Sequence, residues 1–391
     1  MIPVSRMLSL FRFSPSFGER MVYPLVALFF GTGNETKHIS SAILERVFLD
    51  PSMRLFEFSE ESLLASVPTM MAFPELARVY GTWKELAEKN GNVQVEVQRE
   101  VYAVQRNTKE AKRRGGHILA KSRRVDKEGK ALEGKEADER EEIFDELILA
   151  TDADSALKIL QAGSGATWKE KKGLGNVLYK WDTTITHSDY DYMQKYYQMT
   201  YDPQYNADRT DEESKKAFKF AEENWRPLYL IHMYEHDPSL IEMSFDLTHY
   251  QPQFQGKPPT GEGSRITVEE ARPTQRQGVP DPAALDPRPP KQQDSKEEPP
   301  VEQHVYQTIY LNKDLKQYWT DKDVNKDKIV LQKWWKQQSH RWQLYAFTVP
   351  WMWSINGKNN TKWVASYLFL AHALTRLFLP LLTRSFAGGW T

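Results

Sequence analysis

The stretch Phe144–Thr151 constrains the fold of this chain more than any other. Within it, Leu147-Ile148-Leu149 is a short apolar run of the kind that is buried on both faces of a mostly parallel sheet. The small residues Ala150-Thr151 end the run, and Asp152 or Asp154 can cap the helix that follows. A strand that ends on small residues and turns into a helix is where open α/β sheets bind ligands, so this stretch predicts a ligand-facing strand.

Charge and cysteine content exclude several functional classes. The formal net charge of −1 argues against nucleic acid as a partner, because the chain has no basic excess to neutralise phosphates. The chain has no cysteine, which excludes disulfides, thiolate metal sites and cysteine nucleophiles and is compatible with a reducing, cytoplasmic location. A length of 391 residues is enough for two domains. Residues 1–15 do not resemble a secretory signal, because they lack a sustained apolar region.

An apolar run near the N-terminus imitates a dinucleotide-binding fingerprint. Val22–Phe30 is followed by Gly31-Thr32-Gly33, but the third glycine of the fingerprint would fall at Thr36. Pro24 also lies inside the supposed central strand, where it could not donate to the ladder. We therefore expect an apolar helix, a glycine turn and a second helix over Ile39–Phe48.

The region before the opening stretch predicts a helix followed by a small β-meander. Ala77–Lys89 is amphipathic, whereas Val93–Val97 and Val101–Val104 alternate apolar and polar residues. Together with Phe144–Thr151 these two runs suggest a meander. Between them, Lys109–Glu142 is dense in both signs of charge and has poor periodicity, which predicts a solvated loop.

The second half of the chain predicts a mixed or antiparallel sheet with helices. Glu212–Asn224 and Asp327–Arg341 are expected to be helical. Gln253–Glu302 is rich in Pro, Gly and Gln and has few apolar residues, which predicts a disordered insertion. The expected strands are Val177–Trp181, Thr183–Thr186, Leu228–Tyr234, Ile241–Leu247 and Tyr306–Leu311.

The segment Trp363–Leu382 is mostly apolar and has about the length that spans a bilayer. His372 and Arg376 lie inside it, and a central arginine costs roughly 2.5–3.5 kcal/mol on insertion scales. Three alternatives stay open: a membrane span, a buried helix, or an aberrant segment.

Two histidine patterns suggest catalytic chemistry without satisfying its geometry. His232 to His236 matches H-x-x-E-H, but zinc-protease chemistry needs a helix, and the preceding residues alternate like a strand. We interpret the match as a coincidence and predict no metal site. His187-Ser188-Asp189 has the residue types of a triad, yet three adjacent residues cannot assemble one. The sequence therefore identifies no catalytic residue.

Six stretches occur along the chain in an order that resembles a known family. They are Met21–Leu28, Phe144–Leu157, Thr186–Asp189, Glu242–Gln251, Trp334–Trp342 and Phe386–Thr391. The family is the flavin-containing amine-oxidase-like family, in the predicted NAD/FAD-binding oxidoreductase branch seen in bacteria and fungi. The resemblance implies an α+β or α/β fold in which a partial FAD-binding domain, a β-meander plus a returning strand, adjoins a larger substrate domain of antiparallel or mixed sheet and helices. It implies an FAD-dependent oxidoreductase with a small-molecule substrate.

The resemblance also implies which residues contact FAD. The strand pair near Val101 would lie by the adenosine half, and Ala150 and Thr151 would abut the cofactor. Glycines permit close backbone approach and a tryptophan offers a flat apolar wall. The A-G-x-W-T stretch would therefore pack near the flavin and the pyrophosphate through Gly388, Gly389, Trp390 and Thr391.

The chain departs from the family at two places. No G-x-G-x-x-G unit precedes Met21, and Lys362–Ser385 separates Thr361 from the A-G-x-W-T stretch. We hypothesise that residues 362–385 are a foreign insert, such as a translated intron, in a chain truncated at both ends. The alternative function is a catalytically inactive homologue that acts as an interaction protein, or is membrane-associated through residues 363–382.

The expected division of the chain follows from these observations. It comprises a helical part of the substrate domain (1–88), a partial FAD-binding domain (89–160, with the charged loop 109–142), the substrate domain (161–360, with the insertion 253–302), the apolar insert (362–385) and the remnant of the FAD motif (386–391).

Overall fold

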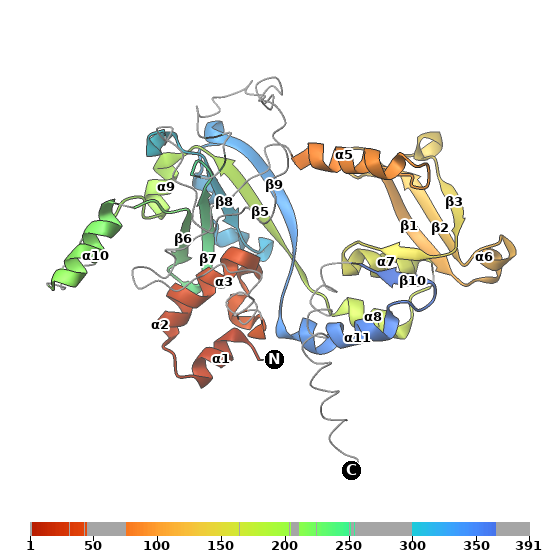
Figure 1. Cartoon of the computed structure of the whole chain (residues 1–391), viewed down its shortest axis with the longest axis horizontal. Coiled ribbons are helices and arrows are strands. Elements are labelled where there is room, and N and C mark those ends of the chain that lie inside the picture. Colours follow the sequence, from red (N-terminus) through yellow and green to blue (C-terminus); the bar gives the residue numbers. More distant parts are fainter. Residues whose placement is uncertain are drawn as a thin grey trace, which may run out of the picture. The chain divides into compact units, whose positions relative to one another are not determined.

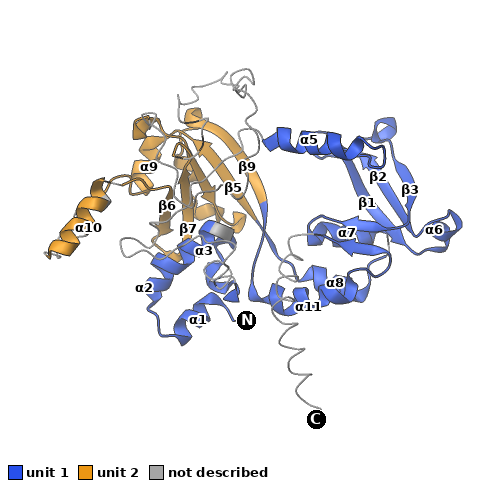
Figure 2. Ribbon diagram, viewed as in Figure 1, with its two compact units in different colours: residues 1–54, 75–180, 336–391 blue, residues 55–74, 181–335 orange. Residues whose placement is uncertain are grey.

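The computed structural model of the chain falls into two compact units (Figure 2). It describes residues 2–44, 76–254 and 299–364, apart from positions 31, 43, 164, 203, 205–210, 224, 250 and 252–253. Unit 1 contains Met1–Arg54, Glu75–Lys180 and Lys336–Thr391, and unit 2 contains Leu55–Pro74 and Trp181–Trp335. The chain therefore passes from unit 1 to unit 2 and back through strands β5 (Tyr179–His187) and β9 (Ile329–Gln338).

Unit 1 contains two small sheets. Strands β1 (Arg99–Arg106), β2 (Ile118–Arg124) and β3 (Arg140–Phe144) form an antiparallel sheet in that order. Strand β4 (Leu147–Leu149) pairs in parallel with β10 (Thr361–Trp363, labelled in Figure 1), a partner more than 200 residues later in the chain. The Leu147 amide donates to the Asn360 carbonyl at 2.8 Å, and the Val364 amide donates to the Leu149 carbonyl at 2.9 Å.

Helices cover the sheets of unit 1. Helix α7 (Ala153–Ala162) packs on β1, and α8 (Trp168–Gly175) packs on both α7 and α11 (Val349–Ile355). A capping box begins α8, because Thr167 and Glu170 satisfy each other's backbone amides. The remaining described α-helices of the unit are α1 (Val4–Leu10), α2 (Pro15–Phe17), α3 (Tyr23–Phe30), α5 (Leu76–Glu88) and α6 (Lys109–Arg113).

Unit 2 is built on a five-stranded sheet with the order β6-β7-β8-β5-β9. Strands β6 (Tyr229–Tyr234), β7 (Asp237–Asp246) and β8 (Tyr306–Tyr310) are antiparallel neighbours, and β8 is antiparallel to β5. Helix α9 (Tyr190–Tyr196) follows β5 and contributes to a buried aromatic cluster on the sheet. Helix α10 (Glu212–Glu223) precedes β6. The mixture of helices with antiparallel and parallel strands confirms the predicted α+β class at this coarse level.

Clear hydrophobic patterns gave the correct element type. The strands expected at Leu228–Tyr234, Ile241–Leu247 and Tyr306–Leu311 correspond to β6, β7 and β8. The two runs expected around Val177–Thr186 are one continuous strand, β5. Helices α5 and α10 lie where helices were expected, and the one at α5 was expected to be amphipathic. The apolar run before Gly31 is the helix α3, so the dinucleotide fingerprint was correctly set aside.

Three local predictions were wrong. The range Asp327–Arg341 was expected to be helical but forms β9, whose β-branched and aromatic residues favour an extended backbone. The run Val93–Val97 forms no strand, and β1 begins two residues later at Arg99. The charged range Lys109–Glu142 was expected to be a loop, but it contains α6 and β2. Its short apolar run, Ile118-Leu119-Ala120, is buried and lies in β2, the central strand of the sheet.

The opening stretch differs from its prediction in two ways. Phe144 ends β3 and Leu147 begins β4, so the stretch belongs to two sheets. Ile148 is 61% exposed, so burial on both faces was wrong. Among the described residues β4 has β10 as its only partner strand, and a two-stranded sheet leaves a face uncovered.

Several predictions fall mainly or wholly outside the described residues. They concern the second helix at Ile39–Phe48, the insertion 253–302, the remnant 386–391 and most of the apolar segment 362–385. The first two residues of that apolar segment, Lys362 and Trp363, belong to β10. Within the part of the chain that the structure describes, no helix has both the length and the apolar character of a membrane span.

Candidate functional site

Ala150 and Thr151 lie at the carboxyl edge of a parallel strand pair. Both residues directly follow β4 and are exposed, and the pairing with β10 brings the carboxyl ends of the two strands to the same edge. Val101 is 39% exposed and lies elsewhere, in β1 of the antiparallel sheet opposite Ser122. The other predicted FAD contacts lie outside the described residues; they are Gly388, Gly389, Trp390 and Thr391.

The helix that follows this edge has its first amides already bonded. Asp152 occupies the N-cap of α7, but its side chain makes no capping hydrogen bond. The Ala153 amide instead donates to the Tyr179 hydroxyl at 2.7 Å, and the Ser155 amide donates to Asp154 Oδ1 at 2.9 Å. Burial, with smaller contributions from the two carboxylates, raises the pKa of Tyr179 well above its ordinary value. Tyr179 is therefore a neutral phenol whose oxygen accepts the helix amide.

Lys336 of β9 lies beside the same helix end. Its ammonium is 3.1 Å from Asp152 and 2.6 Å from Asp154, and it lies 4.4 Å from the centre of the Tyr179 ring. Burial lowers the pKa of Lys336, but the hydrogen bonds to Asp154 and Asp152 outweigh burial and raise it, so the ammonium is charged. Two carboxylates and one ammonium leave a net negative charge. This edge therefore suits a neutral or hydroxyl-bearing group better than a phosphate.

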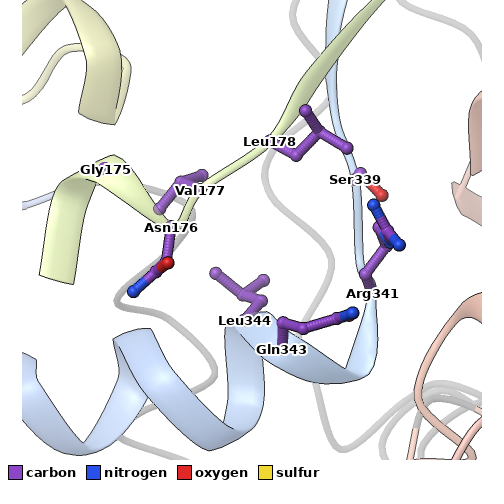
Figure 3. Close-up of a pocket in the computed structure, with 8 residues that line it drawn as sticks. All are labelled: Gly175, Asn176, Val177, Leu178, Ser339, Arg341, Gln343 and Leu344. Atoms are coloured by element: carbon purple, nitrogen blue, oxygen red, sulfur yellow. The ribbon is translucent and has the colours of Figure 1, made fainter. Parts of the chain in front are cut away.

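A cavity of about 240 Å³ lies next along the chain, and Figure 3 shows the side chains around it. One wall joins the end of α8 to β5, and the other follows β9. A hydrogen bond joins the two walls: the Ser339 amide donates to the Leu178 carbonyl at 2.8 Å. Nε of Arg341 and Oε1 of Gln343 are buried atoms without a hydrogen-bond partner. The lining residues are Gly175, Asn176, Val177, Leu178, Ser339, Arg341, Gln343 and Leu344.

The cavity can hold only a small polar group. Drug-sized ligands occupy pockets of roughly 300–1,000 Å³, which is larger than this space. Gln343 offers a carbonyl acceptor without a hydrogen bond, and Arg341 Nε has a long ion-pair contact of 3.7 Å with Glu35, so a fragment with both a donor and an acceptor could bond to both side chains. Leu178 lines the cavity, and the next residue, Tyr179, accepts a hydrogen bond from Ala153, the first residue of α7. The chain therefore connects the cavity to the start of that helix.

The two histidine motifs make structural contacts. His232 lies in β6 with its ring edge-on to Tyr196, and His236 stacks on Tyr318, so the helix that a zinc protease needs is not formed. The His187 ring accepts a hydrogen bond from the Asp189 amide at Nδ1 and lies 2.9 Å from the Thr308 hydroxyl at Nε2.

Burial lowers the pKa of His187 to about 4, so its ring is neutral. The Asp189 carboxylate caps α9 instead of orienting this histidine. This arrangement confirms that the adjacent residues form no triad.

Sequence reasoning missed the non-local partners of the site. Tyr179 and Lys336 gave no motif, and Lys336 lay in a range that was assigned to a helix. A possible metal-ligand group in unit 2 was missed for the same reason, because Asp246 and His249 are far in sequence from His304. One sequence signal could have indicated this group: His249 and His304 lie on either side of the predicted insertion 253–302.

Comparisons with known proteins add no assignment. No family model matches the chain, and a search of curated proteins found no match. The resemblance to the flavin-containing amine-oxidase-like family therefore stays a prediction made from the sequence. Any function assigned to the chain depends on that resemblance together with the geometry described above.

Proposed function

We propose that the chain is an FAD-dependent oxidoreductase of the flavin amine-oxidase-like superfamily that acts on a small molecule. The parallel pairing of β4 with β10 is the observation that supports it most directly. The resemblance expects Phe144–Thr151 to lie against the cofactor, and it expects the stretch ending at Thr361 to lead into a second cofactor motif. The pairing joins these two stretches, and the carboxyl ends of parallel strands are where open sheets bind ligands.

The exposed end of β4 fits part of FAD. Ala150 and Thr151 have small side chains at an exposed edge, so a flat or hydroxyl-bearing group can approach the backbone there. The neutral phenol of Tyr179 and the ammonium of Lys336 lie at the adjoining helix end. Bound flavin would supply the acceptor for a hydride or for electrons from the substrate. The residues proposed to contact the cofactor are Ala150, Thr151 and Val101, with Gly388, Gly389, Trp390 and Thr391 outside the described residues.

The described residues fit the diphosphate of FAD less well than they fit a flat or hydroxyl-bearing part of it. The first amides of α7 are bonded to Tyr179 and Asp154, and the local charge is net negative. Gly33 has a left-handed φ of 57°, but its turn follows the helix α3 instead of a strand. Within the described residues we therefore assign no diphosphate cradle.

FAD uptake by the purified chain tests the proposal. We expect the full chain, mixed with FAD and passed through a desalting column, to retain about one flavin per chain by its visible absorbance. Thr151→Arg should weaken retention about tenfold, ~1.4 kcal/mol, because the long side chain would cover the edge of β4. The matched control is Thr200→Arg at an exposed position of unit 2, which should retain flavin as the wild type does. Folded wild-type chain that retains no flavin would contradict the proposal.

A non-catalytic interaction protein is the second candidate. The bonded amides and net negative charge at the start of α7 favour it, because they leave no diphosphate cradle there. The flavin experiment separates the two candidates. Membrane association through residues 363–382 has its own test: recovery of all the chain in the soluble fraction without detergent would contradict it.

A further inference from the structure

Two histidines and an aspartate converge where β7 ends and β8 approaches. Asp246 is the last residue of β7, His249 lies in the turn after it, and His304 lies two residues before β8. The strands are antiparallel neighbours in the sheet (Figure 1). The three side chains are 4%, 7% and 5% exposed, and one ligand atom from each lies within 4.8 Å of the others.

The His304 ring has an oxygen beside each nitrogen. Nδ1 is 2.6 Å from Asp246 Oδ2, and Nε2 is 2.8 Å from the Pro299 carbonyl. A carbonyl oxygen only accepts, so Nε2 must carry a proton. Nδ1 then either carries a second proton or offers its lone pair to a cation that the carboxylate also binds. Metal-binding histidines are commonly oriented by a backbone carbonyl that accepts a hydrogen bond from the ring nitrogen not bound to the metal.

Asp246 has one carboxylate oxygen bonded to the backbone and the other directed at the two histidines. The Thr248 amide donates to Oδ1 at 3.0 Å, and Oδ2 faces both histidines. His249 Nε2 is 3.4 Å from Oδ2. Tetrahedral bonds of about 2 Å place neighbouring ligand atoms roughly 3.3 Å apart, so this separation already suits a shared ion. The 2.6 Å distance between His304 Nδ1 and Asp246 Oδ2 would have to lengthen slightly to admit the ion.

Arg226 is the group that opposes a cation here. Its Nε donates to His249 Nδ1 at 3.0 Å. Because Nδ1 accepts this hydrogen bond, the proton of a neutral His249 ring lies on Nε2, the nitrogen that faces Asp246. Arg226 is exposed, whereas Asp246 and His304 are buried and His249 is half-buried. Contacts made by an exposed arginine are weak, so a cation can displace the Arg226 contact with His249, which can then exchange its tautomer.

We propose that Asp246, His249 and His304 form a site for a divalent transition-metal ion, with zinc as the best match, in competition with Arg226. Two imidazoles and one carboxylate are a ligand set that zinc accepts, with a fourth position left for water. The inference is independent of the proposed flavin chemistry. Because His249 and His304 are far apart in the sequence, a bound ion would link two distant parts of the chain within unit 2.

Zinc content of the full chain gives the first test. After removal of metal with a chelator and addition of one equivalent of zinc chloride, we expect about one zinc per chain to remain after desalting. Substitution with Co²⁺ should give the visible absorption of a low-coordinate nitrogen and oxygen site. Acidification should release the metal, because protons compete for the imidazoles. Folded wild-type chain with neither bound zinc nor a cobalt spectrum would overturn the proposal.

Four variants separate this site from adventitious binding. Asp246→Asn, His249→Gln and His304→Gln should each lose the bound zinc, and their folding is checked by circular dichroism without metal. His236→Gln is the matched control, since that histidine is exposed and lies outside the group. Wild-type affinity retained in folded Asp246→Asn would also overturn the site.

The competition with Arg226 has a distinct outcome. Arg226→Met should tighten zinc binding about tenfold, the equivalent of ~1.4 kcal/mol, because it removes a positive charge and frees His249 Nδ1. Weaker binding in this variant would overturn the opposing role of Arg226. A merely structural role for the arginine would lower thermal stability without changing the zinc dissociation constant, which would overturn it as well.

Discussion

Each unit contains a fully buried glutamate, and the two side chains have different hydrogen-bond partners. Glu170 of unit 1 is 1% exposed and pairs with Arg106, whereas Glu242 of unit 2 is 0% exposed and meets only hydroxyl and amide donors among its described hydrogen bonds. The two environments shift the pKa of the buried carboxyl group in opposite directions. The difference shows that burial alone does not fix the direction of that shift.

Glu170 is part of a buried ion pair. Nη1 and Nη2 of Arg106 donate to its two oxygens at 2.7 Å each, and the Thr167 amide donates to Oε2 at 2.7 Å. Burial raises the pKa of Glu170, but the Arg106 and Thr167 hydrogen bonds outweigh burial and lower it. Arg106 also donates to the Thr361 hydroxyl and the Gly165 carbonyl. The pair thus links β1, α8 and β10, whose residues are up to 255 positions apart.

Glu242 is part of a network of uncharged hydrogen-bond donors. The Tyr234 hydroxyl and the Thr320 amide donate to Oε1 at 2.6 and 2.8 Å, and the Thr320 hydroxyl lies 2.5 Å from Oε2. Tyr192 and Tyr310 extend the chain of hydroxyls from Thr320. Burial raises the pKa of Glu242 despite the hydrogen bonds from Thr320 and Tyr234. None of these described hydrogen bonds comes from a cation, so burial shifts the pKa of Glu242 upward, the opposite direction to that of Glu170.

Glu170→Gln should be the most destabilising of the changes considered for these regions. The variant leaves the Arg106 guanidinium buried without an opposite charge, and breaking a buried pair on one side costs about 3–5 kcal/mol. The free energy of unfolding of unit 1, from urea denaturation at neutral pH, should fall by that amount. The folded pKa of Glu170 is depressed, so its contribution is present above the unfolded pKa and disappears as pH falls through the folded pKa.

A double replacement checks that explanation. Glu170→Leu combined with Arg106→Met removes both charges and should recover much of the stability lost in Glu170→Gln. A loss below 1 kcal/mol in Glu170→Gln itself would show that this pair is not what distinguishes unit 1.

Gly163→Ala should have an intermediate effect at the same corner of unit 1. A Cβ at Gly163 would overlap the carbonyl of Val104, which is backbone and cannot rotate away. Forcing extra atoms into a packed contact costs about 1–3 kcal/mol, here by displacing α7 from β1. Thermal unfolding measures the loss.

Gly81→Ala in α5 is the matched control, because a Cβ there meets nothing within 4 Å. Since the change improves helix propensity, it should stabilise the chain by about 0.5–1 kcal/mol. Equal effects at the two glycines would remove the steric explanation for Gly163.

Sequence reasoning succeeded where a strand is mostly buried or half-buried and failed where it is mostly exposed or lies among charged residues. Strands β6, β7 and β8 lie largely as expected, because most of their residues are buried or half-buried, and β8 alternates between the two. In β9 most residues, including Trp334 and Trp335, are exposed, so no alternation identifies the strand. In β2 the short run Ile118-Leu119-Ala120 was hidden among charges.

The candidate site was predictable only in its local part. The pattern of Phe144–Thr151 located an exposed edge at Ala150-Thr151, but the pairing with β10 and the contacts of Tyr179 and Lys336 come from distant parts of the chain. One sequence without an alignment contains no signal for such contacts. The Asp246–His304 contact spans 58 residues and was missed for that reason.

Glu242→Gln should have the smallest effect and the most informative pH dependence. A glutamine can accept from Tyr234 and from the Thr320 amide through its carbonyl. Its amide can donate to the Thr320 hydroxyl once that hydroxyl turns to donate to Tyr192 instead. The variant should therefore stay within about 1 kcal/mol of the wild type, the scale of one hydrogen bond.

The sign of the pH dependence follows from the raised pKa. The folded chain binds a proton at Glu242 more tightly than the unfolded chain does, so wild-type stability falls as pH rises from about 4.3 through the folded pKa. Glutamine cannot titrate, so the stability of Glu242→Gln relative to the wild type should increase between pH 4 and neutrality, as urea denaturation at a series of pH values will measure. A relative stability that decreases over this range would mean that Glu242 is ionised like Glu170, and the contrast between the two units would fail.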